Sequence, residues 1–500
     1  MQKLFWENRT VFILAAIGSA AGLGNLWRFP YLAYEHGGGA FVFAIIIANL
    51  LIGIPLLILE IALGQKTQKG AADALAAIKS SFRYVGWTAL LISFLVVVYY
   101  MAVVSYGINF FTSAFTLSWL PSVHDFFFND VLQISSGPTD IGGMSYPVLS
   151  GLLLGWALVY FSVWKGVKSI GAVVKWTATL PFVILFILII RAVTLPGATD
   201  GLHVFLIPDW GALIDPHLWL DAFSQVFFSL SLAFGIMVAY GSLNRPGTEI
   251  TKSALWIALG NFVVSLMSGL VVFGTLGYMA LQKGTAITDV VAGGPSLVFV
   301  VFPEAINLLP TLNALVAVLF FLMLLTLAID SAFSLLEALS TSIRDRFPDA
   351  SIKRIAFVIT FFGVLGGLFY STKAGLYYLD ITDHFLVSYG LVIIGILEAC
   401  IVGWVWKKNE LVDFIKDHSD LHLEKLWTFS IRWLTPIFLT VLLIWNLVIE
   451  FEAPYSGYPV MSLIYIGLIP LLLTPVVGVI LDKITAPHKE GFFRRLIGKS

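Results

Sequence analysis

Three polar side chains of this chain lie inside apolar segments, where their types can support binding chemistry. Asn25 and Arg28 belong to the glycine-interrupted segment 18–41, GSAAGLGNLWRFPYLAYEHGGGAF, and Asp330 lies within FFLMLLTLAIDSAFSLL. An acid in such a run is rare unless it faces a cavity or an ion. Irregular backbone at membrane depth persists only where protein, water or a bound ion satisfies its carbonyls. We therefore predict a binding site at the interruption, in which freed carbonyls hold a cation and helix N-termini face an anion.

The segments that position these residues have the composition of membrane helices. The 500 residues are 59% hydrophobic and only 12% charged, against roughly 25% charged residues in soluble domains. Apolar runs of about 20 residues, the length that crosses a bilayer, recur along the whole chain. We predict an all-α polytopic membrane protein with twelve transmembrane helices, near 10–33, 39–64, 87–115, 145–163, 170–193, 219–241, 252–281, 311–341, 355–371, 377–406, 430–450 and 459–481.

The basic residues predict the topology, since short cytoplasmic loops hold most Lys and Arg. An N-terminus inside the cell gathers 25 of the 29 basic residues on one side, all except Arg28, Arg191, Lys283 and Lys373. If the first span were removed as a signal peptide, the remaining spans would place most of these basic residues outside the cell, against this rule. We expect a multi-pass plasma-membrane protein with both termini cytoplasmic and a basic tail, 482–500, near anionic lipid.

Other partners and chemistries are disfavoured by composition. The net charge of −1 indicates no nucleic-acid partner, and one cysteine, Cys400, allows no intramolecular disulfide. The spans contain no GxxxxGK[ST] loop, which argues against an ATP-driven pump within this chain. We expect no enzyme activity and infer no obligate protein partner.

The first and sixth spans share a polar interruption of small residues, GSAAGLGN (18–25) in one and SLSLAFG (229–235) in the other. Broken helices at corresponding places in two halves indicate a secondary transporter built from inverted repeats. We expect one transporter domain over 1–500, with repeats at 10–193 and 219–406 and two additional helices within 430–481.

Five segments carry a resemblance to a known family: GSAAGLGNLWRFPYLAYEHGGGAF, QVFFSLSLAFG, MLLTLAIDSAF, AGGPSLVFVVFPEAI and GLYYLDITDHF. In this order and spacing, over residues 5–450, the chain resembles the neurotransmitter:sodium symporters, and within them the bacterial amino-acid transporter branch that includes the bacterial leucine transporter. The resemblance implies a sodium-coupled symporter that imports a neutral amino acid, with a hydrophobic side chain, by alternating access. It also implies a 5+5 inverted repeat with discontinuous first and sixth helices.

The resemblance implies where the substrate binds. Unwound backbone at Ala20–Gly24 and the Tyr100 hydroxyl would hold its carboxylate. Gly22 stands where monoamine carriers of the family have aspartate, so the substrate is expected to bring its own carboxylate. No charged group faces its side chain, which implies a neutral one. The implied set is Ser19, Ala20, Gly22, Leu23, Gly24, Val96, Tyr100, Phe228, Ser229, Ser231, Phe234, Ser331 and Leu335. Tyr99 is expected only to pack, and the methyl of Ala233 to narrow the pocket.

Two sodium sites follow from the resemblance. Sodium site one would use Ala20, Asn25, Ser229 and Asn261 together with the substrate carboxylate, so each ligand raises the affinity of the other by the same factor. Sodium site two would use Gly18, Ala21, Leu327, Asp330 and Ser331. The family also needs a negative charge near site one, from chloride or from a glutamate. Chloride dependence stays open, because Ile45 replaces a tyrosine in a chloride-binding set otherwise matched by Gln225, Ser229, Asn261 and Ser265.

Two charged pairs resemble the gates of the family. Arg28 and Asp383 would close the outer side above the aromatic lid of Phe234 and Tyr100, while Lys3 and Asp345 would close the inner side beside Trp6. Glu60 matches an acid that ties neighbouring helices together. A non-transporting amino-acid sensor, a channel-like protein and a proton-coupled carrier are the alternatives. Two opposed gates favour alternating closure over a continuous pore.

Overall fold

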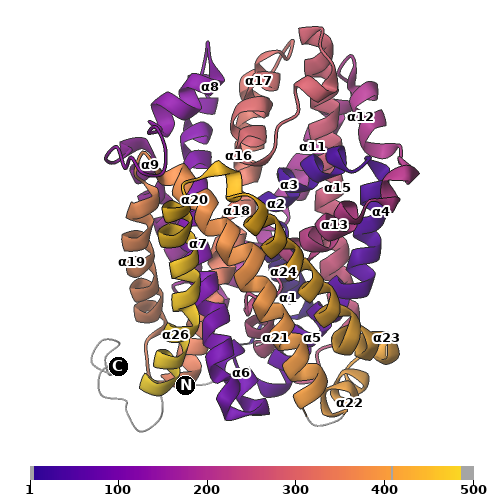
Figure 1. The fold of residues 1–500 in the computed structure, drawn as a ribbon, viewed down its shortest axis with the longest axis vertical. Helices are drawn as coiled ribbons and strands as arrows, with labels where there is room; N and C mark the ends of the chain where they lie inside the picture. The colour runs from indigo at the N-terminus through magenta and orange to yellow at the C-terminus, as the bar shows by residue number, and fades with distance from the viewer. Residues whose placement is uncertain (1–4, 407–408, 486–500) are drawn as a thin grey trace.

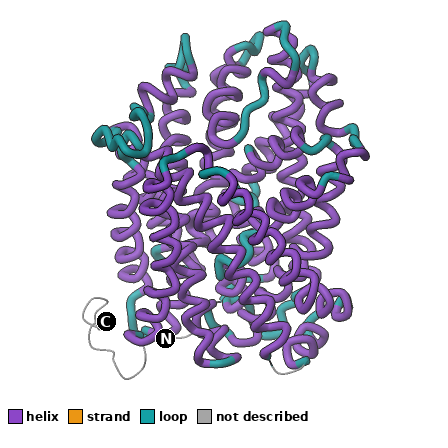
Figure 2. Tube along the Cα trace, in the orientation of Figure 1, coloured by secondary structure: helices purple, strands orange, loops and turns teal. Residues whose placement is uncertain are grey.

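The computed structural model describes residues 5–406 and 409–485. In this part of the chain the molecule is a helical bundle without β-strands, apart from two isolated bridges, Gly38–Pro208 and Met144–Thr372 (Figure 1). Figure 2 shows loops gathered at both ends of the bundle and short loop segments interrupting helices in its middle. The all-α polytopic fold predicted from composition is confirmed.

Ten helices of the described residues are long and apolar enough to cross a membrane. They are Gly39–Thr67 (with α4, Gly39–Ala48, and α5, Ile54–Thr67), Ser80–Ala114 (with α7, Arg83–Ala114), Tyr146–Val163 (α9), Val167–Val193 (α10, Val167–Thr177, and α11, Leu180–Val193), Thr251–Lys283 (α15), Asn313–Arg346 (α18), Ile352–Tyr370 (α19), Gly375–Val405 (with α20, Gly375–Phe385, and α21, Val392–Cys400), Glu424–Gly457 (with α23, Glu424–Phe429, and α24, Thr435–Glu452) and Val460–Ile484 (α25, Val460–Ser462, and α26, Ile469–Ile484).

The predicted first and sixth spans are broken helices, and only the first adds an eleventh candidate span to these ten in the described residues. The first consists of α1 (Arg9–Ala20), α2 (Leu23–Leu26) and α3 (Arg28–Glu35), with a bend of 62° after Ala20. The sixth consists of α13 (Pro216–Ser229) and α14 (Ile236–Ser242). The shorter helices are α6 (Ala71–Ile78), α8 (Val123–Asp125), α12 (Ala198–Leu206), α16 (Gly294–Ser296), α17 (Phe302–Asn307) and α22 (Glu410–Asp417).

The break between α13 and α14 is held by unusual backbone. Ser231, Ala233 and Gly235 all have positive φ, at 55°, 65° and 73°, which removes these residues from the helical ladder. The Ala233 N–H donates at 2.8 Å to the fully buried Glu60 of α5. Ser93 of α7 donates at 2.8 Å to the Phe234 carbonyl. Side chains of neighbouring helices therefore replace some of the backbone bonds that the break gives up, and Glu60 ties α5 to the break as predicted.

The broken helices lie inside the bundle. The α1 helix packs against α10, α15 and α18, while α14 packs along α5 and α7 packs along α18. Large apolar side chains on the outer helices are half exposed or more, among them Phe186, Phe361 and Ile437, as a lipid-facing surface requires. The core thus surrounds both interruptions and keeps them from lipid.

Candidate functional site

A cavity of about 700 Å³ lies at the two interruptions. All thirteen residues of the predicted substrate set line it, and so do Asn25 and Arg28. From the breaks the cavity extends past Asp383 toward the end of the bundle that is predicted to be extracellular. Residues 294–296 and Tyr455 and Tyr458 line that outer part. The cavity therefore includes the predicted substrate set, and its outer part also uses the segment between the last two predicted spans.

The turn between α1 and α2 forms one wall. The Gly22 N–H donates to Asn25 Oδ1 at 3.0 Å, which caps the short α2 helix. A Cβ on Gly22 would lie 2.9 Å from Ser331 Oγ and 3.9 Å from the Tyr100 hydroxyl. Glycine is therefore the residue that leaves space between the turn and α18.

The Tyr100 side chain brings a free donor to this turn. Its hydroxyl lies close to Ser331 and to the Leu23 backbone, yet it is buried and makes no hydrogen bond with the described residues. An unsatisfied buried hydroxyl costs about 1–3 kcal/mol. A carboxylate at Gly22 would accept this hydrogen bond and remove that cost.

The side chains predicted for sodium site one lie together. Asn25 Nδ2 donates to Asn261 Oδ1 at 2.8 Å and to Ser265 Oγ at 2.7 Å, and Asn261 Nδ2 donates to Ser229 Oγ at 3.0 Å. These groups come from α2, α13 and α15. The cluster offers neutral oxygen donors, which suit a hard cation, and none of these four side chains carries a charge.

The predicted sodium site two contains an isolated acid. Asp330 is fully buried, and neither of its carboxylate oxygens accepts a hydrogen bond from the described residues. The neighbouring Thr177 hydroxyl donates instead to the Val173 carbonyl, at 3.1 Å. A Cβ on Gly18 would come within 2.5 Å of Asp330 Oδ2, so the α1 backbone touches this carboxylate. A buried charge without partners is costly, and a cation between the two helices would neutralise it.

The predicted outer gate is not paired. Arg28 donates to Gln225 Oε1 and to Ser224 Oγ, both at 3.1 Å, and lies 3.8 Å from Asp221. Asp383 accepts a hydrogen bond from the Tyr99 hydroxyl instead. Both gate residues line the cavity, so the cavity stays open between them.

Two sequence expectations on this side are wrong. Tyr99 does more than pack, because its hydroxyl holds the Asp383 carboxylate and its ring lines the cavity. Ala233, expected to narrow the pocket, is 1% exposed and does not line the cavity. The outer wall also uses tyrosines that sequence analysis missed, since Tyr455 and Tyr458 both donate to Asp380. Only the tertiary fold brings these residues from distant spans together.

The opposite end of the broken helices is closed. The Trp6 indole N–H donates to the Tyr240 carbonyl, and the Trp6 backbone N–H donates to the Leu243 carbonyl, both at 3.0 Å. Trp6 is 3% exposed, as expected for a residue that caps this end. Of the predicted inner gate, Lys3 lies outside the described residues, while Asp345 accepts the Gly70 N–H at 2.6 Å.

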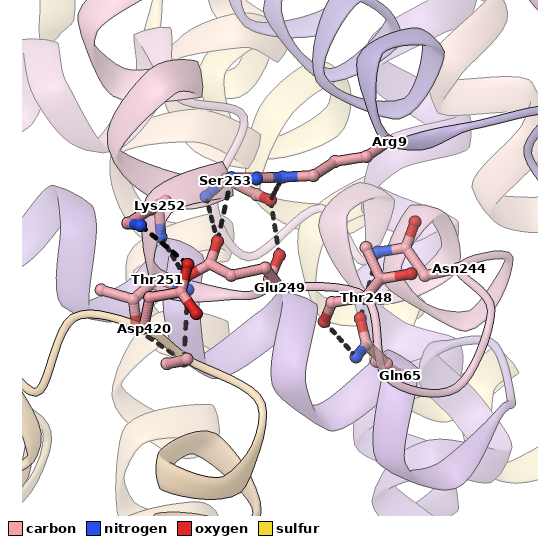
Figure 3. Close-up of polar contacts among 10 residues, drawn as sticks. Arg9, Gln65, Asn244, Thr248, Glu249, Thr251, Lys252, Ser253 and Asp420 are labelled. Atoms are coloured by element: carbon pink, nitrogen blue, oxygen red, sulfur yellow. Dashed lines mark hydrogen bonds and ion pairs between the residues drawn. The ribbon is translucent and has the colours of Figure 1, made fainter.

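Figure 3 shows a second set of contacts at this end. Arg9 of α1 pairs with Glu249 at 3.0 Å and donates to Ser253 Oγ, at the start of α15. Lys252 pairs with Asp420 at 2.7 Å, and this hydrogen bond lowers the pKa of the exposed Asp420 carboxyl. Polar contacts thus join α1, α15 and the segment after α22 below the cavity.

A helical bundle with two broken helices around a central cavity, closed at one end, has the architecture of a secondary transporter. The model of the family described as the sodium:neurotransmitter symporter family matches residues 3–121 and 118–484. The chain belongs to this family, so it is a multi-pass membrane protein that carries out sodium-dependent transport and is not an enzyme.

Relatives extend over nearly the whole chain. A protein of Methanocaldococcus jannaschii named uncharacterized sodium-dependent transporter is 38% identical over 97% of this chain and 98% of its own length. Human sodium- and chloride-dependent GABA transporter 2 is 33% identical over 90% of this chain and 80% of its own length. The sodium- and chloride-dependent GABA transporter ine of Drosophila melanogaster is 34% identical over 84% of this chain, which spans about half, 49%, of that protein.

Proposed function

We propose that this transporter imports a neutral amino acid with a hydrophobic side chain, coupled to sodium. The carrying observation is the arrangement at Gly22, where an uncharged turn and the unpartnered Tyr100 hydroxyl face one space. These groups suit a carboxylate. The side-chain part of the deep cavity is lined by Val96, Phe234 and Leu335, which favour an apolar group over a charged one.

Two sodium ions complete the proposal. The first would bind beside the substrate carboxylate at the Asn25–Asn261–Ser229 cluster, with the Ala20 carbonyl. The second would bind at Asp330 and Ser331 with the carbonyls of Gly18, Ala21 and Leu327. Direct contact between the first ion and the substrate couples their affinities reciprocally, and each ion that enters down a 100 mV potential contributes about 2.3 kcal/mol to uptake.

We propose that the chain transports its substrate by alternating access. A helical bundle would move against a scaffold around the cavity, in a fold built from the inverted repeats 10–193 and 219–406, with both termini in the cytoplasm and the protein in the plasma membrane. The open Arg28–Asp383 pair and the buried Trp6 fit the outward-facing end of that cycle. Pairing of Arg28 with Asp383 would then close the outer side while Trp6 leaves Tyr240.

The test is uptake of a panel of radiolabelled amino acids, with GABA included, into proteoliposomes under an inward sodium gradient. Sodium-dependent accumulation of neutral hydrophobic α-amino acids supports the proposal. Accumulation of GABA alone would contradict the proposed cargo and extend the substrate named for the relatives to this chain. Sodium-dependent binding without accumulation under any gradient would instead make it a sensor.

The Tyr100→Phe variant should bind the substrate about tenfold or more weakly, because a hydrogen bond to a charged group contributes roughly 1.5–3 kcal/mol. The ring and its packing stay in place, so folding should be retained. Equilibrium binding of the accumulated amino acid measures the loss. Tyr106→Phe is the control, since Tyr106 is also buried on α7 with an unpartnered hydroxyl but does not line the cavity. Equal affinities for wild type and Tyr100→Phe would remove this hydroxyl from the site.

Replacing chloride with gluconate should slow uptake, because the cluster of Gln225, Ser229, Asn261 and Ser265 is neutral while a cation binds beside it. Ser265 lies 2.7 Å from Asn25 Nδ2, so Ser265→Glu would supply a fixed negative charge at the same place. We expect uptake by this variant to be independent of chloride. Wild-type rates that are identical in chloride and gluconate would contradict the proposed anion site.

A further inference from the structure

The inner half of α18 carries a line of polar side chains, of which the proposed function uses only Asp330. Below Asp330 come Ser334, Glu337, Thr341 and Arg344, at successive steps of four, three, four and three residues. Residues at this spacing share one face of a helix. Asp330, Ser334 and Glu337 are fully buried, Thr341 is 4% exposed and Arg344 is 19% exposed. We call these five residues the polar stripe.

The polar stripe faces the two broken helices and the turn between α9 and α10. Ser19 of α1 donates to Ser334 Oγ at 2.8 Å, and the Tyr240 hydroxyl of α14 lies close to Ser334. At the lower end, the Arg344 guanidinium lies against Gly166. The stripe thus runs from the proposed second sodium site toward the end that Trp6 closes.

Glu337 lies in the middle of the polar stripe with only half of its carboxylate satisfied. Oε1 accepts a hydrogen bond from Thr341 at 3.2 Å and lies 3.7 Å from Arg344 Nη1, too far for a hydrogen bond. Oε2 makes no hydrogen bond with the described residues, and neither does the buried Tyr240 hydroxyl. A loosely paired buried acid is destabilising, so this carboxylate has capacity for a further cation.

We propose that Glu337 is a transit site for sodium, where the ion binds after it leaves Asp330 and before it reaches the cytoplasm. The inference rests on the proposed function, in which Asp330 holds the second sodium. Two helical turns, about 10 Å along the helix axis, separate Asp330 from Glu337, with Ser334 between them in the stripe. Arg344 neutralises Glu337 while the transit site is empty, and an arriving ion displaces it.

The test compares two modes of transport by Glu337→Gln in proteoliposomes, with the panel of radiolabelled neutral amino acids. Net uptake requires the release of sodium into the vesicle. Exchange of amino acid across the membrane, at equal saturating sodium on both sides, does not require this release. We expect net uptake to fall about tenfold, equivalent to ~1.4 kcal/mol, while exchange stays within about twofold. Equal losses in both modes, or no loss of net uptake, would overturn the transit site.

Two further variants separate transit from a structural ion pair. Arg344→Gln removes the competing cation, so internal sodium should inhibit net uptake at about tenfold lower concentration; unchanged inhibition would contradict the proposal. This readout does not depend on how well Glu337→Gln folds. Glu398→Gln on α21 controls for loss of a buried acid, since Glu398 is 1% exposed with both oxygens unpartnered. It should keep the wild-type ratio of net uptake to exchange.

Wild-type exchange also separates this proposal from the proposed function. If wild type shows no sodium-dependent transport in either mode, the proposed function fails. If wild type transports and the Glu337→Gln variant shows no selective loss of net uptake, only the transit site fails.

Discussion

Asp330→Asn will remove sodium-dependent uptake and weaken the sodium dependence of substrate binding by about 100-fold or more. The carboxylate is fully buried, has no hydrogen-bond partner in the described residues and touches the α1 backbone at Gly18. Asparagine keeps the size and one oxygen but loses the charge that a cation would neutralise. Equilibrium binding of the accumulated amino acid, titrated with sodium chloride against potassium chloride, gives the measurement.

Thermal unfolding gives a second readout of the same variant. A ligand that binds only the folded protein stabilises it, by about 2.7 kcal/mol at one hundred times its dissociation constant. Sodium should therefore raise the Tm of wild type and have little effect on Asp330→Asn, which should be the more stable protein in potassium because it buries no charge. The Glu398→Gln variant should respond to sodium as wild type does. A sodium-induced rise in Tm of equal size in Asp330→Asn would contradict the second site.

The parts of this protein that sequence predicts well are those in which a residue conflicts with its surroundings. Asp330 is an acid in an apolar run, and Gly22 interrupts a membrane helix, so each residue indicates a site without knowledge of its neighbours. The structure places Gly22 in the cavity wall, while Asp330 lies buried against the α1 backbone at Gly18. The spans are equally predictable, because membrane thickness fixes their length and lipid fixes their composition.

The parts that sequence predicts poorly depend on which helices meet. Tyr99 looks like a packing residue in an apolar helix, and its bond to Asp383 exists only because α7 lies near α20. Tyr455 and Tyr458 lie beyond the proposed repeats, yet they reach Asp380 at the outer cavity. The positive φ of Ala233 is also unexpected for a residue with a Cβ, and it is stabilised by a side chain from another helix, Glu60.

The Gly22→Asp variant should bind zwitterionic amino acids at least about 100-fold more weakly than wild type. Two carboxylates about 4 Å apart repel by roughly 4 kcal/mol at an effective dielectric constant of 20, and the new side chain would also crowd Ser331, which lies 2.9 Å from the Cβ position. Competition by a panel of amino acids and of the corresponding amines without a carboxylate measures the change.

The matched control for charge is Gly22→Asn, which has almost the same volume as the aspartate variant. It should lose affinity through crowding alone, so the difference between the two variants reports the repulsion between carboxylates. Gly22→Asp should also discriminate less against amines, since their cationic group gains a partner in the turn. If both variants bind amino acids with the same affinity, and amines gain nothing in Gly22→Asp, the substrate carboxylate does not lie at Gly22.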